Sequence, residues 1–174
     1  KVLMKLTDDN AIDIQYEAET DKPTIVNMTN QPYFNLEGDA GNNSGHLLMV
    51  DADYYTPVDS TFMTTGEIVP VEEPDGFPQG HKIGDEIELI LTAQDPGGYD
   101  HNYVTDGYNK ASIREIAEAW SEKTGIQMNV LIRTVLVTVF MSANFVDSGT
   151  WQKRPMFIIN VRHSVWRRKV EPNA

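Results

Sequence analysis

Four histidines and no cysteine limit the chemistry that this sequence could carry out. The histidines are not at the spacing of metal ligands, and the lack of cysteine removes thiolate zinc sites, disulfides and cysteine nucleophiles. The sequence also has no phosphate-binding loop, dinucleotide fingerprint or nucleophilic-serine motif. We therefore expect no metal and no cofactor. His46 and His81 lie in polar loop sequence, and we expect both side chains to be solvated.

The charge of the chain is strongly negative, with a formal net charge of -12 over 174 residues. Residues 1–107 carry 4 basic and 21 acidic side chains, whereas residues 108–174 carry 10 basic and 5 acidic ones. Because phosphate binding depends on clustered Lys and Arg, this balance argues against nucleic acid as a partner. No apolar run approaches the ~20 residues of a membrane helix, so no membrane partner is expected. The lack of cysteine suits the cytoplasm, with secretion as the alternative, and no particular oligomeric state is predicted.

The elements that would position functional residues are mostly short strands. Residues 11–18 alternate apolar and polar side chains, residues 2–6 do so more loosely, and Asp8-Asp9-Asn10 is a turn between them. Further strands are expected at 24–29, 47–50, 86–92, 130–139 and 157–161. Many short strands with turns between them predict an antiparallel sandwich or barrel, and no linker is long enough to divide it.

One segment has the spacing of a helix instead. Apolar side chains lie at i, i+3, i+4 and i+7 within residues 111–123, at Ile113, Ile116, Ala117 and Trp120. Ser112 and Glu115 fit a capping box, and Gly125 could end the element. We expect a short amphipathic helix here.

Four motifs follow one another in the first part of the chain. They read DKPTIVNMTNQPYFNL at 21–36, DYYTPVD at 53–59, TGEIVPV at 65–71 and GYDHNYV at 98–104. In this order they resemble the galactose mutarotase (aldose 1-epimerase) family, in which the first motif has the pattern DKPTxVNLTNHxYFNL. Later stretches are less similar: SANFVD at 142–147 corresponds to TGNFLDG, and INVRH at 159–163 falls where the family has LETQH.

The resemblance implies a fold. It is a mainly β, antiparallel β-sandwich of the galactose mutarotase type (a supersandwich) with at most one or two short helices. A single such domain is expected over residues 1–174, with a strong match over 1–107 and a weak one over 108–174. Complete members are longer at the N-terminus, where they supply another active-site histidine and an arginine, so a truncated form of the fold is expected.

The resemblance also implies a reaction, the interconversion of α and β anomers of a free aldohexose such as galactose or glucose. A base takes the proton of the anomeric hydroxyl while an acid protonates the ring oxygen. The acid position falls at Gln31 and the base position at Asn160, and neither carboxamide ionises usefully near neutral pH. The family's sugar-contacting Gln falls at Val139. Asp100 keeps a sugar-binding carboxylate.

Two further residues of these motifs are candidates for substrate binding, Asn30 and His101, although for His101 a structural hydrogen-bonding role is favoured over a catalytic one. Three functions stay open at this point. The first is an aldose 1-epimerase-like protein that interconverts or binds hexose anomers. The second is a non-catalytic carbohydrate-binding protein derived from a mutarotase, since general acid–base help, worth ~10²–10⁴-fold per group, should be largely lost. The third is a structural or interaction protein with a vestigial cleft.

Overall fold

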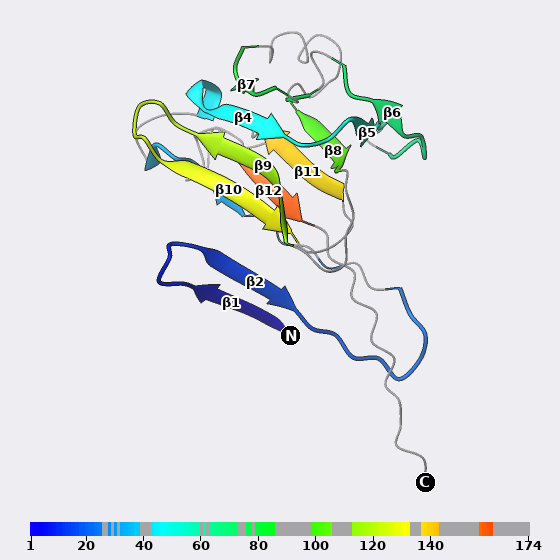
Figure 1. Ribbon diagram of the computed structural model, residues 1–174. Coiled ribbons are helices and arrows are strands. Elements are labelled where there is room, and N and C mark those ends of the chain that lie inside the picture. The colour runs from blue at the N-terminus through cyan, green and yellow to red at the C-terminus, as the bar shows by residue number, and fades with distance from the viewer. Residues whose placement is uncertain are drawn as a thin grey trace, which may run out of the picture. The chain divides into compact units, whose positions relative to one another are not determined.

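The structure is a computed structural model, shown in Figure 1. It describes residues 1–25, 28, 30, 32–38, 43–59, 61, 63–72, 76–77, 79–85, 99–105, 113–132, 137–142 and 157–161, with the backbone alone at 33, 100, 137–142 and 157–161. The chain divides into two compact units, one of Lys1–Thr29 with Arg162–Ala174 and one of Asn30–Val161. A single domain over residues 1–174 stays a prediction.

The first unit contains an antiparallel hairpin of β1 (Val2–Leu6) and β2 (Ile12–Tyr16), paired from Val2↔Tyr16 to Leu6↔Ile12. The expected turn connects them, and Asn10 has a φ of 62°, a left-handed conformation that asparagine adopts more readily than most residues. The strand expected at 24–29 does not begin at Thr24 or Ile25, and residues 26, 27 and 29 lie outside the described residues.

The second unit contains a four-stranded sheet in the order β10-β9-β4-β7, in which all neighbours are antiparallel. Its strands are β4 (Leu47–Val50), β7 (His81–Lys82), β9 (Arg114–Trp120) and β10 (Gln127–Ile132). A one-turn 3₁₀ helix, η2 (Asn43–Gly45), precedes β4. The strand expected at 47–50 is therefore confirmed.

The second unit also contains a six-stranded antiparallel sheet in the order β3-β12-β11-β8-β5-β6. Its strands are β3 (Tyr33–Phe34), β5 (Tyr54–Thr56), β6 (Val69–Pro70), β8 (Asp100–Val104), β11 (Val137–Ser142) and β12 (Phe157–Val161). The sequence predicts the bounds of β12 correctly. The strand expected at 86–92 lies outside the described residues.

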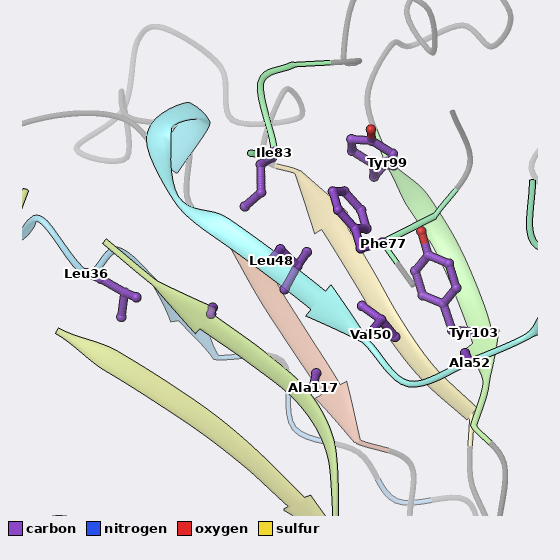
Figure 2. Close-up of a cluster of buried hydrophobic side chains, with 10 residues drawn as sticks. Leu36, Leu48, Val50, Ala52, Phe77, Ile83, Tyr99, Tyr103 and Ala117 are labelled. Carbon is purple, nitrogen blue, oxygen red and sulfur yellow. The ribbon is translucent and has the colours of Figure 1, made fainter. Parts of the chain in front are cut away.

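The core of this unit draws side chains from both sheets, as a sandwich requires. Leu48 and Val50 of β4 and Ala117 and Ala119 of β9 belong to the same buried cluster as Tyr99 and Tyr103 at β8; Leu36, Ala52, Phe77 and Ile83 complete it. Figure 2 shows the aromatic side chains of Phe77, Tyr99 and Tyr103 grouped beside the aliphatic side chains of β4. The antiparallel, mainly β sandwich expected from the sequence is confirmed.

The helix expected within residues 111–123 is wrong, because Arg114–Trp120 form strand β9. The apolar spacing arises from a β-bulge: the register shifts between Val130, which pairs with Ala117, and Leu131, which pairs with Glu115, so Ile116 is the extra residue. Two consecutive side chains, Ile116 and Ala117, are thereby buried, which breaks the alternation of a strand. Pairing on both sides with β4 and β10 overrides the local pattern. Gly125, at a φ of 71°, belongs to the β9–β10 turn.

The expectation that His46 and His81 are solvated is also wrong. His46 follows η2 and is fully buried, while His81 is half-buried in β7 with its ring stacked on that of Phe77 at a centroid distance of 4.4 Å. Polar neighbours in the sequence did not indicate this burial, because it depends on how the segment before β4 and strand β7 pack in the folded unit. Within the described ranges, no helix is long and apolar enough to cross a membrane.

Candidate functional site

The motif GYDHNYV forms β8 and the residues just before it, and strand geometry sorts its side chains onto two faces. Tyr99, His101 and Tyr103 are 1%, 2% and 0% exposed, so this set faces the core. Their rings lie in a row, with centroids 6.0 Å apart between Tyr99 and His101 and 5.9 Å apart between His101 and Tyr103. The intervening positions, Asp100 and Asn102, therefore belong to the other face of the sheet, which we call the outer face.

The strand register places the base position and the sugar-binding positions of the later motifs on that outer face as well. Residues directly opposite each other in an antiparallel pair share a face. Asn102 pairs with Val139, and Val139 pairs with Asn160, so these three positions form one row across β8, β11 and β12. Asp100 lies in the adjacent row, opposite Met141. Asp100, Val139 and Asn160 are thus brought to one face of one sheet.

The first motif approaches the same rows from the far edge. Tyr33 of β3 pairs with Ile158, which lies two residues before Asn160 and shares its face. Asn30 is half-buried and precedes β3, and Gln31 lies outside the described residues. His101 is separated from the other candidates, since it is buried on the core face beside Tyr55, with ring centroids 5.0 Å apart. That placement favours the structural interpretation of His101.

The loop after β3 is anchored to the β9–β10 turn by three side chains. Lys123 Nζ donates to Glu37 Oε2 at 2.8 Å, Ser121 Oγ donates to Glu37 Oε1 at 3.2 Å, and Thr124 Oγ1 donates to the Leu36 carbonyl oxygen at 2.9 Å. The hydrogen bond from Lys123 holds the pKa of the Glu37 carboxyl below its usual value. Because Leu36 is also buried in the core, the end of the first motif is fixed to the four-stranded sheet.

Sequence reasoning did not select Asn102, although the structure places it in the outer-face row of Asn160. Its Nδ2 donates to Thr56 Oγ1 at 2.6 Å, and the two residues are direct neighbours across β5 and β8. The spacing could have revealed it, because a polar residue two positions from Asp100 in a strand shares the same face. No group of three His, Asp or Glu side chains among the described residues could hold a metal ion.

Comparisons with known proteins point to one family. The sequence model of the aldose 1-epimerase family matches residues 1–173. The aldose 1-epimerase of Escherichia coli K12 is 34% identical over 145 residues, which is 83% of this chain and 41% of that protein. Human galactose mutarotase is 30% identical over 146 residues, covering 77% of this chain and 38% of the relative. The chain thus spans about two-fifths of the length of these relatives.

A solved structure has the same fold. The crystal structure of a GalM/aldose epimerase homologue from C. elegans superposes with a TM-score of 0.74 over 92% of this chain and 49% of that one, at 24% sequence identity. The family match over nearly every residue, the two named relatives and the shared fold agree with one another. The chain belongs to the aldose 1-epimerase family.

Proposed function

We propose that this chain binds a free aldohexose, such as galactose or glucose, on the outer face of the six-stranded sheet. The observation that carries the proposal is the strand register, in which Asp100 and Asn160 share that face on strands separated only by β11. Two strand spacings and a two-residue offset correspond to about 12 Å between the two backbones, which leaves room for a monosaccharide between polar side chains. Val139 and Met141 lie between them.

The same positions argue for binding with little anomer interconversion. Opening and closing the sugar ring requires one group that removes a proton from the anomeric hydroxyl and one that protonates the ring oxygen. Gln31 and Asn160 stand at those two positions, and a carboxamide donates and accepts hydrogen bonds without transferring a proton near neutral pH. The Asp100 carboxylate is the charged acceptor that remains for a sugar hydroxyl.

Calorimetric titration with galactose, glucose and other common hexoses tests binding. We expect a saturable signal for at least one aldohexose and none for its open-chain alditol, which has similar hydroxyls but no ring. Absence of a signal for every hexose would leave the third hypothesis, an interaction protein with a vestigial cleft.

A reducing compartment such as the cytoplasm is part of the proposal, on the ground that the sequence contains no cysteine.

An active aldose 1-epimerase is the second candidate, and the family match over residues 1–173 is the observation that favours it. Polarimetry of freshly dissolved α-galactose or α-glucose separates the two candidates. A binding protein leaves the rate of anomer equilibration at the buffer value, whereas an epimerase raises it in proportion to protein concentration. Human galactose mutarotase provides the positive control.

A further inference from the structure

The carboxamide of Asn102 has one satisfied end and one unsatisfied end. Its Nδ2 donates to Thr56 Oγ1 at 2.6 Å, and Thr56 Oγ1 in turn donates to the backbone carbonyl oxygen of Asn102 at 3.5 Å. Its Oδ1 is buried and has no hydrogen-bond partner among the described residues. A buried acceptor without a donor is unfavourable and rare in folded proteins, so this oxygen calls for an explanation.

The place of this oxygen suggests its partner. Asn102 lies two residues from Asp100 on the outer face and in the same row as Asn160, with Val139 between the two asparagines. The neighbour on one side is thus apolar at Val139, and on the other side Thr56 is already occupied with Nδ2. Among the described residues, neither neighbour in this row thus supplies a donor for Oδ1, and a molecule bound between the rows of Asp100 and Asn160 is one source of such a donor.

We propose that Asn102 is a further sugar-binding residue, whose carboxamide oxygen accepts a hydrogen bond from one hydroxyl of the bound hexose. The inference rests on the proposed function. It makes Thr56 a positioning residue, because the hydrogen bond from Nδ2 fixes which end of the carboxamide is free. Because Asp100 occupies a position in the adjacent row of the same face, the site suits a ligand that presents two neighbouring hydroxyls as donors.

Such an acceptor would also determine specificity. A site built to pair with a hydroxyl rejects an analogue that lacks it, because the buried protein group is then left without a partner. One monodeoxy sugar should therefore bind much more weakly than its parent, and the others less so. The competing explanation is that a trapped water satisfies Oδ1, in which case the asparagine contributes to folding alone.

The test combines variants of the chain with variants of the sugar. Asn102→Leu keeps the approximate size and removes the acceptor, and Asn129→Leu, at an exposed strand position of the four-stranded sheet, is the matched control. For Asn102→Leu we expect the affinity for the parent hexose to fall about tenfold, and for the control no change. The monodeoxy sugar that binds most weakly to the unmodified chain should bind to Asn102→Leu as well as the parent does.

A second pair of variants addresses the positioning role. Thr56→Val removes the acceptor of the Nδ2 hydrogen bond and should lower the affinity severalfold, whereas Thr56→Ser keeps the hydroxyl and should restore it. If the unmodified chain binds no hexose, both the proposed function and this inference fail. If it binds hexose and Asn102→Leu binds equally well, or loses the same factor for every deoxy sugar, only the inference on Asn102 is overturned.

Discussion

The two faces of β8 differ in the burial and chemical type of their residues, although one motif supplies both faces. On the core face, Tyr99, His101 and Tyr103 are almost fully buried and their rings lie in a row, edge to face between Tyr99 and His101 and stacked between His101 and Tyr103. On the outer face, the Asn102 position lies in one row with Thr56 and Asn160, and Asp100 lies in the adjacent row. The motif thus contributes alternate residues to the core and to the face that we propose binds a hexose. Which face a residue belongs to follows from its place in this alternation and not from its membership in the motif.

The largest effect that would test this contrast between the two faces is a gain of catalytic activity by substitution of the family's acid and base positions. The double variant Gln31→His, Asn160→Glu places an acid and a base at the two family positions, and we expect mutarotation to accelerate by on the order of 10²–10⁴-fold. Polarimetry of α-galactose measures the rate. Each single variant should gain much less, since ring opening needs both proton transfers.

The matched control for that gain is Asn129→Glu, at an exposed position of β10 in the other sheet. It should leave the rate at the value of the unmodified chain. If the rate of mutarotation is unchanged in the double variant as well, the outer face does not correspond to the catalytic site of the family, and the contrast between the two faces of β8 is contradicted.

A loss of stability is the effect expected on the core face. Phe77 is 1% exposed and its ring contacts those of Tyr99 and His81, so Phe77→Ala should lower the free energy of unfolding by about 3–5 kcal/mol. Urea unfolding measures it. Phe77→Leu keeps most of the volume and should cost under about 1.5 kcal/mol. In both variants the folded fraction should bind hexose with unaltered affinity. A large loss of affinity in Phe77→Leu would contradict the assignment of the core face to folding and of the outer face to binding.

The converse result is expected at Asp100. Asp100→Asn removes a charged acceptor, and we expect hexose affinity to fall about 10- to 100-fold while the free energy of unfolding changes by less than about 0.5 kcal/mol. Titration calorimetry and urea unfolding of the same preparation supply both values. Glu118→Gln, on the other sheet beside Gln127, is the control that should retain full affinity. Destabilisation of Asp100→Asn without loss of affinity would assign Asp100 to the fold.

The smallest effect concerns a polar group inside the core. Burial lowers the pKa of His46, and the Glu37 carboxylate opposes that shift to a lesser degree. The unfolded chain therefore binds a proton more readily than the folded chain below about pH 6.5. With respect to His46, the free energy of unfolding is therefore at its full value above that pH, and it decreases as the pH falls below it. Urea unfolding between about pH 8 and about pH 5 should show this slope.

His46→Gln removes the titrating group and should flatten the profile in that window, although its overall stability is lower. Glu37 contributes at more acidic pH, because its own pKa is held below the usual value by Lys123. A profile that stays equally steep in His46→Gln would assign the pH dependence to other groups.

The sequence predicts the type of fold well because alternation and turn chemistry are local. The strand at Phe157–Val161 has the expected bounds, and the turn at Asp8-Asp9-Asn10 is where it should be. It fails at Arg114–Trp120, where a bulge against β10 imitates helical spacing and only the partner strands reveal the difference. It fails likewise for His46, whose burial depends on the packing of distant segments.

The site was predictable in part for the same reason. The motifs select Asp100 and Asn160, but nothing in the sequence places β11 between β8 and β12, and that order is what determines which positions share a row. Asn102 could have been chosen by counting two residues from Asp100. Its hydrogen bond to Thr56 could not, because it depends on the pairing of β5 with β8.

The order of the six-stranded sheet has a consequence for synthesis on the ribosome. β12 is the last strand of its unit along the chain, yet it is inserted between β3 and β11. Until β12 has been synthesised, β3 and β11 each have an edge with unpaired backbone hydrogen-bonding groups, and these edges can pair with other chains. A pause in translation just before Phe157 lengthens the time in which such aggregation can occur. Expression at low temperature, or together with a chaperone that holds unfolded chains, should therefore increase the yield of soluble protein. We expect this increase to exceed the effect of any substitution in the motifs that are translated earlier.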